Sequence, residues 1–202
     1  MQIASYSMLF KDRRREKYLW TDPKVGSITK LGMMHSLLTF GVGVIAIQTG
    51  LNLLYGIFAV MLSLILVSMI LSRLNFVKLD VQREVPDELF SQTKIALTAQ
   101  VSNKKKWFSV FSIWMEEAWP PDVPHPEILP SVYVLRIKPD SAESLKYDIE
   151  FPRRGVFTFL GFTFATRFPF SMFTYFYYLR SEQEVIVFPR LRELPSSLKL
   201  IG

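Results

Sequence analysis

The pattern of apolar and charged positions sets one apolar region apart from the rest of the chain. Residues 31–72 contain no Asp, Glu, Lys or Arg over 42 consecutive positions. One bilayer-spanning helix requires about 20 apolar residues, so this run is long enough for two. With a polar break at residues 48–52, the sequence predicts two transmembrane helices, over residues 30–48 and 51–71. Three glycines in them allow close contact within the hairpin or with a partner: Gly41, Gly43 and Gly56.

Downstream of this hairpin the period of the pattern changes to alternation. Apolar side chains occupy every second position at Ile95, Leu97, Ala99 and Val101, which indicates a strand with one buried face. Similar candidates are found at residues 107–119, 132–137, 145–151, 156–167 and 184–188. Short strands without an amphipathic helix favour an all-β antiparallel sandwich of immunoglobulin-like size over residues 76–194. Five prolines between residues 120 and 130 predict an extended loop.

The net charge of +6 arises mainly from the segment before the hairpin. Residues 1–30 carry seven basic and three acidic side chains, and the turn between the helices carries none. By the positive-inside rule, both ends of the hairpin lie in the cytoplasm, which predicts a multi-pass membrane protein with its N and C termini in the cytoplasm. The lysines of residues 104–106 are expected in a solvated turn, with anion or lipid contact as the alternative. The basic residues that set this topology are Arg13, Arg14, Arg15, Lys17, Lys30 and Arg73.

Candidate chemistry is scarce along the whole chain. There is no cysteine, and the two histidines, His35 and His125, are far apart in the sequence. No phosphate loop, dinucleotide fingerprint, zinc spacing or nucleophile elbow occurs. Glu116 and Glu117 are adjacent on a predicted strand and point to opposite faces, which disfavours an acid/base pair. We expect neither an enzyme nor a bound cofactor, and without a basic stripe with interleaved aromatic residues we expect no nucleic-acid partner.

Residues 167–180 contain seven aromatic side chains in fourteen positions. We expect Phe168, Phe170 and Phe173 to close one end of the core. The run from Tyr175 to Tyr178 exceeds what one strand face can bury, so the excess is expected to contact a protein partner or the lipid interface. The candidate interaction residues are Phe170, Met172, Phe173, Tyr175, Phe176, Tyr177 and Tyr178.

The order of these features resembles the N-terminal half of the bacterial membrane proteins called the domain of unknown function 58 family. The similarity lies in the hairpin, then "LDVQREVPDELFSQTKIALTAQVSNKKK", and then "RRGVFTFLGFTFATRFPFSMF" before "EVIVFPRL". Ser171 and Met172 replace the Gly-Leu of the family pattern. Family members continue into a region resembling a von Willebrand factor A domain, so residues 195–202 are expected to be a C-terminal tail or a truncation point. The family-like positions are Arg83, Pro86, Asn103, Arg154, Gly155, Pro169 and Pro189.

The resemblance implies a function as well as an organisation. Residues 1–30 would form a basic cytoplasmic tail, residues 31–72 the hairpin, and residues 76–194 a cytoplasmic sandwich. Family members are often encoded beside a MoxR-type AAA+ ATPase and von Willebrand factor A proteins, which implies a membrane-anchored scaffold acting with such partners on envelope complexes. The alternative is a structural subunit of a transport or secretion machine.

Overall fold

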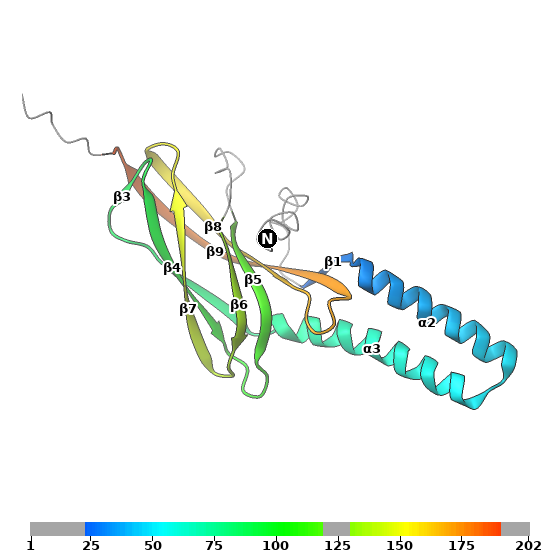
Figure 1. Cartoon of the computed structure of the whole chain (residues 1–202). Coiled ribbons are helices and arrows are strands. Elements are labelled where there is room, and N and C mark those ends of the chain that lie inside the picture. Colours follow the sequence, from blue (N-terminus) through cyan, green and yellow to red (C-terminus); the bar gives the residue numbers. More distant parts are fainter. Residues whose placement is uncertain (1–22, 119–129, 191–202) are drawn as a thin grey trace, which may run out of the picture.

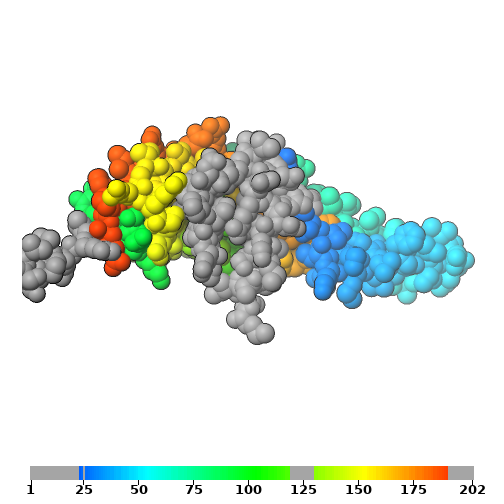
Figure 2. Space-filling model, turned by 90° about the horizontal axis from the view of Figure 1, so that it is seen from above, coloured from blue at the N-terminus to red at the C-terminus, as the bar shows by residue number. Residues whose placement is uncertain are grey.

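The computed structural model describes residues 23–118 and 130–190. The hairpin projects from one end of a body made of strands, and the strand β1 precedes it (Figure 1). From above, the hairpin is a narrow extension of that wider body (Figure 2). The elements are β1 (Lys24–Ile28), α2 (Lys30–Thr49), α3 (Asn52–Phe76), β2 (Leu79–Glu84), β3 (Leu89–Phe90), β4 (Lys94–Asn103), β5 (Val110–Ala118), β6 (Ser131–Ile137), β7 (Ser141–Glu150), β8 (Gly155–Thr166) and β9 (Phe173–Phe188).

The two predicted helices are present, and the break between them is where the polar residues indicated. Helix α2 ends at Thr49 and is capped by Gly50, whose φ of 67° places it in the left-handed conformation that glycine adopts readily at a helix C-terminus. Helix α3 continues beyond the predicted end at residue 71, because its last turn packs on the sandwich at Asn75 and Phe76. Both helices are long and apolar enough to cross a membrane, and most of their apolar side chains are exposed. These properties suggest membrane association.

Contacts within the hairpin are close at one glycine only. A Cβ atom on Gly43 would lie 2.9 Å from the ring of Phe58, so the absence of a side chain lets the helices approach there. The same atom on Gly41 or Gly56 would meet nothing within 4 Å. The imidazole Nε2 of His35 also bridges the helices by donating to the carbonyl of Met61 at 3.1 Å. Gly43 therefore serves the hairpin itself.

The strands form two sheets that enclose one core. One sheet has the order β1-β9-β8-β5-β6, with β3 pairing in parallel to β9, and the other has the order β2-β4-β7. The alternation predicted for β4 is confirmed, since Ile95, Leu97, Ala99 and Val101 are all buried in that core. The chain therefore combines a helical hairpin with antiparallel sheets in a sandwich arrangement.

The structure differs from the prediction in two neighbouring strands of the larger sheet, β1 and β9. Strand β1 lies within the segment expected to be a tail, and it pairs with β9 from Lys24 opposite Phe176 to Ile28 opposite Phe173. Strand β9 begins at Phe173, whereas the pattern predicted a strand only from residue 184. A strand with both faces buried shows no alternation of apolar and polar residues, which is why its first half was missed. The proline-rich loop expected between residues 120 and 130 falls almost wholly outside the described residues.

Candidate functional site

Both helices meet the sandwich at the turn between β8 and β9, residues 167–172. The N-cap of α2 is Thr29, whose hydroxyl accepts from the amide of Gly32 at 3.0 Å. The same hydroxyl donates to the carbonyls of Ser171 at 2.6 Å and Met172 at 3.0 Å, and the amide of Thr29 donates to Met172 at 3.0 Å. One residue thus begins the helix and ties it to the turn.

Gly32 lets the first turn of α2 lie directly on this backbone. A Cβ atom there would be 2.1 Å from the carbonyl oxygen of Met172, which no side chain can tolerate without movement of the backbone. The contact between helix and turn is therefore a backbone-to-backbone contact, closer than two side chains would permit. Any larger residue at position 32 separates α2 from the sandwich.

The last turn of α3 is held by buried polar side chains. Asn75 is completely buried; its amide group donates to the carbonyl of Phe111 at 2.6 Å, and its Oδ1 accepts from the amide of Phe111 at 2.8 Å. Ser72 donates to the carbonyl of Phe168 in the turn. Phe76 stacks on Tyr177 of β9 with ring centroids 5.5 Å apart. These contacts fix the direction in which α3 leaves the sandwich.

The loop between β4 and β5 completes the junction from the other side of α3. Lys105 Nζ donates to the carbonyls of Leu74 and Asn75, both at 2.9 Å, in the last turn of α3, where the Leu74 carbonyl also accepts from the amide of Val77 at 3.3 Å. Burial lowers the pKa of Lys105 to about 8. The expectation of a solvated turn is therefore wrong for Lys105, although Lys104 and Lys106 are exposed.

Asn103, a family-like position, organises the same loop. Its amide donates to the carbonyls of Phe108 at 2.9 Å, Lys138 at 3.1 Å and Ile137 at 3.3 Å. Its carbonyl oxygen accepts from the amide of Lys105 at 3.2 Å. With both ends of its side chain used, Asn103 joins the β4–β5 loop to the β6–β7 turn and presents Lys105 to the helix.

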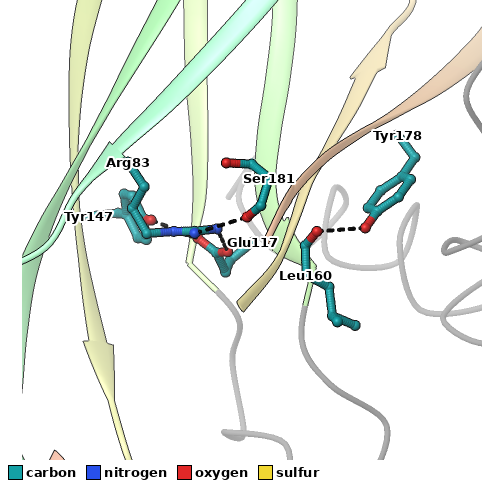
Figure 3. A network of polar contacts seen from close by, with 6 residues as sticks. All are labelled: Arg83, Glu117, Tyr147, Leu160, Tyr178 and Ser181. Atoms are coloured by element: carbon teal, nitrogen blue, oxygen red, sulfur yellow. Dashed lines mark hydrogen bonds and ion pairs between the residues drawn. The ribbon is translucent and has the colours of Figure 1, made fainter. Parts of the chain in front are cut away.

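A second polar cluster lies between the two sheets (Figure 3). Arg83 on β2 forms a buried ion pair with Glu117 on β5, and Tyr147 on β7 donates to Glu117 at 2.6 Å. Nη1 of Arg83 also donates to the carbonyl of Ser181 on β9 at 3.2 Å. The guanidinium carbon lies 4.2 Å from the ring centroid of Phe159, which adds a cation–π contact.

Burial dominates the electrostatics of this cluster. It raises the pKa of Glu117 to about 7, against the opposing effects of the Arg83 charge and the hydrogen bonds from Tyr147 and Arg83. Burial and the neighbouring carboxylate also raise the pKa of Tyr147. The side chains of Arg83 and Glu117 are completely buried, so this cluster ties the sheets together and offers no surface to a substrate. Sequence reasoning missed it, since Glu117 was considered only beside Glu116.

The aromatic run of residues 173–178 is packed on both faces of its sheet. Tyr175 belongs to the main core, whereas Phe176 and Tyr178 form a second cluster on the opposite face with Ala118 and Ala165. The expectation that this run exceeds what the strand can bury is wrong, because one strand buries two faces here. Among the seven candidate interaction residues, Phe170 is exposed and Tyr177 is half-buried, and the others are buried: Met172, Phe173, Tyr175, Phe176 and Tyr178. The expectation that Phe170 closes the end of the core is therefore wrong, whereas Phe173 is part of the core.

The remaining family-like positions have individual roles in the backbone or lie at the surface. Gly155 begins β8 with a φ of 140°, a conformation that L side chains rarely adopt. Pro169 follows a cis peptide bond in the β8–β9 turn. Of the topology-setting residues, Lys30 and Arg73 are exposed at the ends of the helices that meet the sandwich. Three further family-like positions are exposed: Pro86, Arg154 and Pro189. The expectations for Arg13, Arg14, Arg15, Lys17 and residues 195–202 lie outside the described residues.

The part of the chain that the structure describes contains no group of three His, Cys, Asp or Glu residues able to hold a metal ion. No family model matches the chain, and no curated protein is significantly similar to it. The best-defined candidate site is accordingly the junction, formed by Thr29, Gly32, Ser72, Asn75, Asn103, Lys105 and the turn of residues 167–172.

Proposed function

We propose that the protein is a membrane-anchored scaffold of the bacterial inner membrane that holds its sandwich in a fixed orientation at the cytoplasmic surface. The observation that carries this proposal is the junction. A simple tether requires no contact between helix and domain, whereas here the contacts of Thr29, Ser72, Asn75 and Lys105 engage both helices.

The short connections around the hairpin support the same conclusion. A single residue separates β1 from α2, and Val77 and Lys78 alone separate α3 from β2. Flexible linkers let a domain reorient, and these connections are too short to act as linkers. An orientation fixed by the chain itself suits a protein that presents one surface to another component.

The end of the sandwich opposite the hairpin offers such a surface. Val156 on β8 and Ile186 on β9 are paired in register and are 62% and 61% exposed, and Phe188 nearby is 44% exposed. Exposed apolar residues grouped together are typical of protein contact sites. By the resemblance described above, a MoxR-type AAA+ ATPase or a von Willebrand factor A protein is the expected partner.

Site-specific photo-crosslinking in native membranes tests this function. A photoreactive residue at Ile186 should give a defined adduct with another protein. The matched control is Lys146, an exposed position of β7 in the other sheet, which should give none. Absence of any adduct from Ile186, or equal labelling from both positions, would contradict the scaffold proposal.

The orientation has a separate test. Protease added to intact spheroplasts should leave the sandwich uncut, and it should cut the exposed loops once the membrane is opened by detergent. Cleavage in intact spheroplasts would place the sandwich outside the cytoplasm and reverse the topology derived from the positive charges.

One observation favours the alternative, a structural subunit of a transport or secretion machine. An apolar groove of about 630 Å³ runs along α2, lined by residues that include Met34, Leu38, Gly41 and Ile45. Because the chain has no cysteine, a single cysteine at Gly41 is a clean probe of this groove. Intermolecular disulfides formed by Gly41→Cys in native membranes would favour a subunit packed against other spans, and their absence would favour an isolated anchor.

A further inference from the structure

The loop between β4 and β5 exposes a large aromatic side chain beside the helical hairpin. Trp107 is 93% exposed, and it directly follows the three lysines of residues 104–106. Full exposure of an indole to water is unfavourable, because its large apolar surface stays hydrated. The loop itself is firmly held by Asn103 and Lys105, so the exposure is a feature of its folded form.

The contact of Lys105 with α3 fixes the depth of this loop relative to a membrane. Helix α3 has 25 residues, and a hydrocarbon core of about 30 Å takes about 20 of them. Counted from the hairpin tip, the core then ends near Ser72, just before the charged Arg73. The carbonyls of Leu74 and Asn75, which accept from Lys105, therefore lie in the headgroup layer, which is roughly 5–7 Å thick on each side.

Trp107 must lie in or next to this layer. One residue, Lys106, separates it from Lys105, so the Cα atoms of Lys105 and Trp107 are at most about 7 Å apart. Indole rings favour that layer, because they combine an apolar body with one N–H donor. The exposed ring is thus placed where a bilayer, rather than water, is its natural surrounding.

Charge at the same level selects the kind of lipid. Lys106 is exposed beside Trp107, and Lys104 is exposed while pairing with Asp80 at 2.6 Å. Lys30 and Arg73 lie at the helix ends that enter the sandwich. This concentration of positive charge favours anionic headgroups over zwitterionic ones.

We propose that the β4–β5 loop is an interfacial anchor: Trp107 inserts into the headgroup layer of an anionic phospholipid bilayer, and Lys104 and Lys106 contact the lipid phosphates. This inference rests on the proposed membrane anchoring by the hairpin. It adds a contact point beside the two helices, and together the three fix the tilt of the sandwich over the membrane.

The test uses the full chain in vesicles of phosphatidylglycerol with brominated acyl chains, which quench nearby indoles. The signal of Trp107 is the spectrum of the wild type minus that of W107F, since the chain has four tryptophans. We expect this difference spectrum to be blue-shifted and to lose most of its intensity with brominated lipid. A red, unquenched difference spectrum, typical of an indole in water, would overturn the proposal.

Two control variants in the W107F background separate this inference from membrane anchoring itself. Leu66→Trp places an indole at an exposed position of α3, where quenching is expected if the hairpin crosses the membrane. If L66W is quenched and Trp107 is not, the loop anchor alone fails; if L66W is unquenched, the anchoring proposal fails as well. Val156→Trp lies on β8 opposite Ile186, about 45 Å along β9 from the junction, and should stay unquenched. Quenching of V156W would show that the contact is not specific to the loop.

The role of charge has its own variant. K104Q/K106Q should reduce the quenching of Trp107 in phosphatidylglycerol vesicles, and the wild type should be quenched less in brominated phosphatidylcholine. Equal quenching of wild type and variant in both lipids would overturn the assignment of the lysines to anionic headgroups.

Discussion

Removal of one partner from the buried Arg83–Glu117 pair should destabilise the protein far more than removal of both. Both side chains are completely buried, and together they connect β2 to β5. In Arg83→Met the carboxylate of Glu117 loses its cation in the core. In Glu117→Leu the guanidinium remains charged, because arginine does not release its proton at accessible pH.

The magnitude follows from the desolvation of each charge. Loss of one partner of a buried ion pair costs about 3–5 kcal/mol, whereas replacement of both by apolar residues is often neutral or stabilising. A protein of ordinary stability unfolds at a cost of about 5–15 kcal/mol, so either single variant removes a large share. Because the pKa of Glu117 is already raised to about 7, R83M can relieve its penalty by protonation at pH 5, whereas E117L cannot.

Urea unfolding of the full chain in mild detergent, followed by tryptophan fluorescence, measures these effects as a double-mutant cycle. We expect R83M/E117L to lie within about 1 kcal/mol of the wild type, with a coupling free energy of about 3 kcal/mol or more. R83M should be more stable at pH 5 than at pH 8. Single variants that cost less than about 1 kcal/mol, or a double variant as unstable as the sum of the singles, would refute the reasoning.

Three further changes test other contacts. The raised pKa of Glu117 means that the folded state binds more protons than the unfolded state between pH 4.5 and about 7. The stability that this group contributes is therefore complete below that window and is lost as pH rises through it. Glu117→Gln should remove this decline from urea midpoints measured between pH 5 and 8. Asn75→Ala leaves the carbonyl and the amide of Phe111 on β5 without this partner and should lower the free energy of unfolding by about 2–4 kcal/mol. As a control, Asn52→Ala at the exposed hairpin tip should change the free energy of unfolding by less than about 0.5 kcal/mol. Gly43→Leu would press on the ring of Phe58 in α3 and should lower the free energy of unfolding by about 1–3 kcal/mol. Gly41→Leu has open space around it and should not lower this free energy. Equal effects of the two substitutions would contradict the packing described.

The hydrogen bonds of the junction bear directly on the proposed scaffold function. The polar groups that join hairpin and sandwich are short side chains bonded to backbone carbonyls and amides, and such bonds fix both distance and direction. For the scaffold function proposed above, a displacement at the outer end of the sandwich would be passed to the helices through these bonds. A scaffold that reports the state of a partner to the membrane, or holds that partner at a set height, requires this kind of connection.

The sequence alone determined the elements whose signal is local. The charge-free run of residues 31–72 predicts two helices because a bilayer tolerates few charges, and the alternation in β4 and β7 predicts strands because side chains of a strand alternate between faces. Polar residues at 48–52 likewise marked the turn between the helices. Each of these signals depends only on neighbouring residues and on backbone geometry.

Only the tertiary structure decided which residues are brought together across the chain. Thr29 and Met172 are 143 positions apart, and Ser72 and Phe168 are 96 apart, so no local pattern distinguishes these polar side chains from solvated ones. The burial of the aromatic run depends on small residues of β5 and β8 at Ala118 and Ala165, and that of Lys105 on the end of α3. The spacing of apolar residues within one helix or strand shows which of its faces is apolar. The partner of a single polar group depends instead on which distant elements pack together.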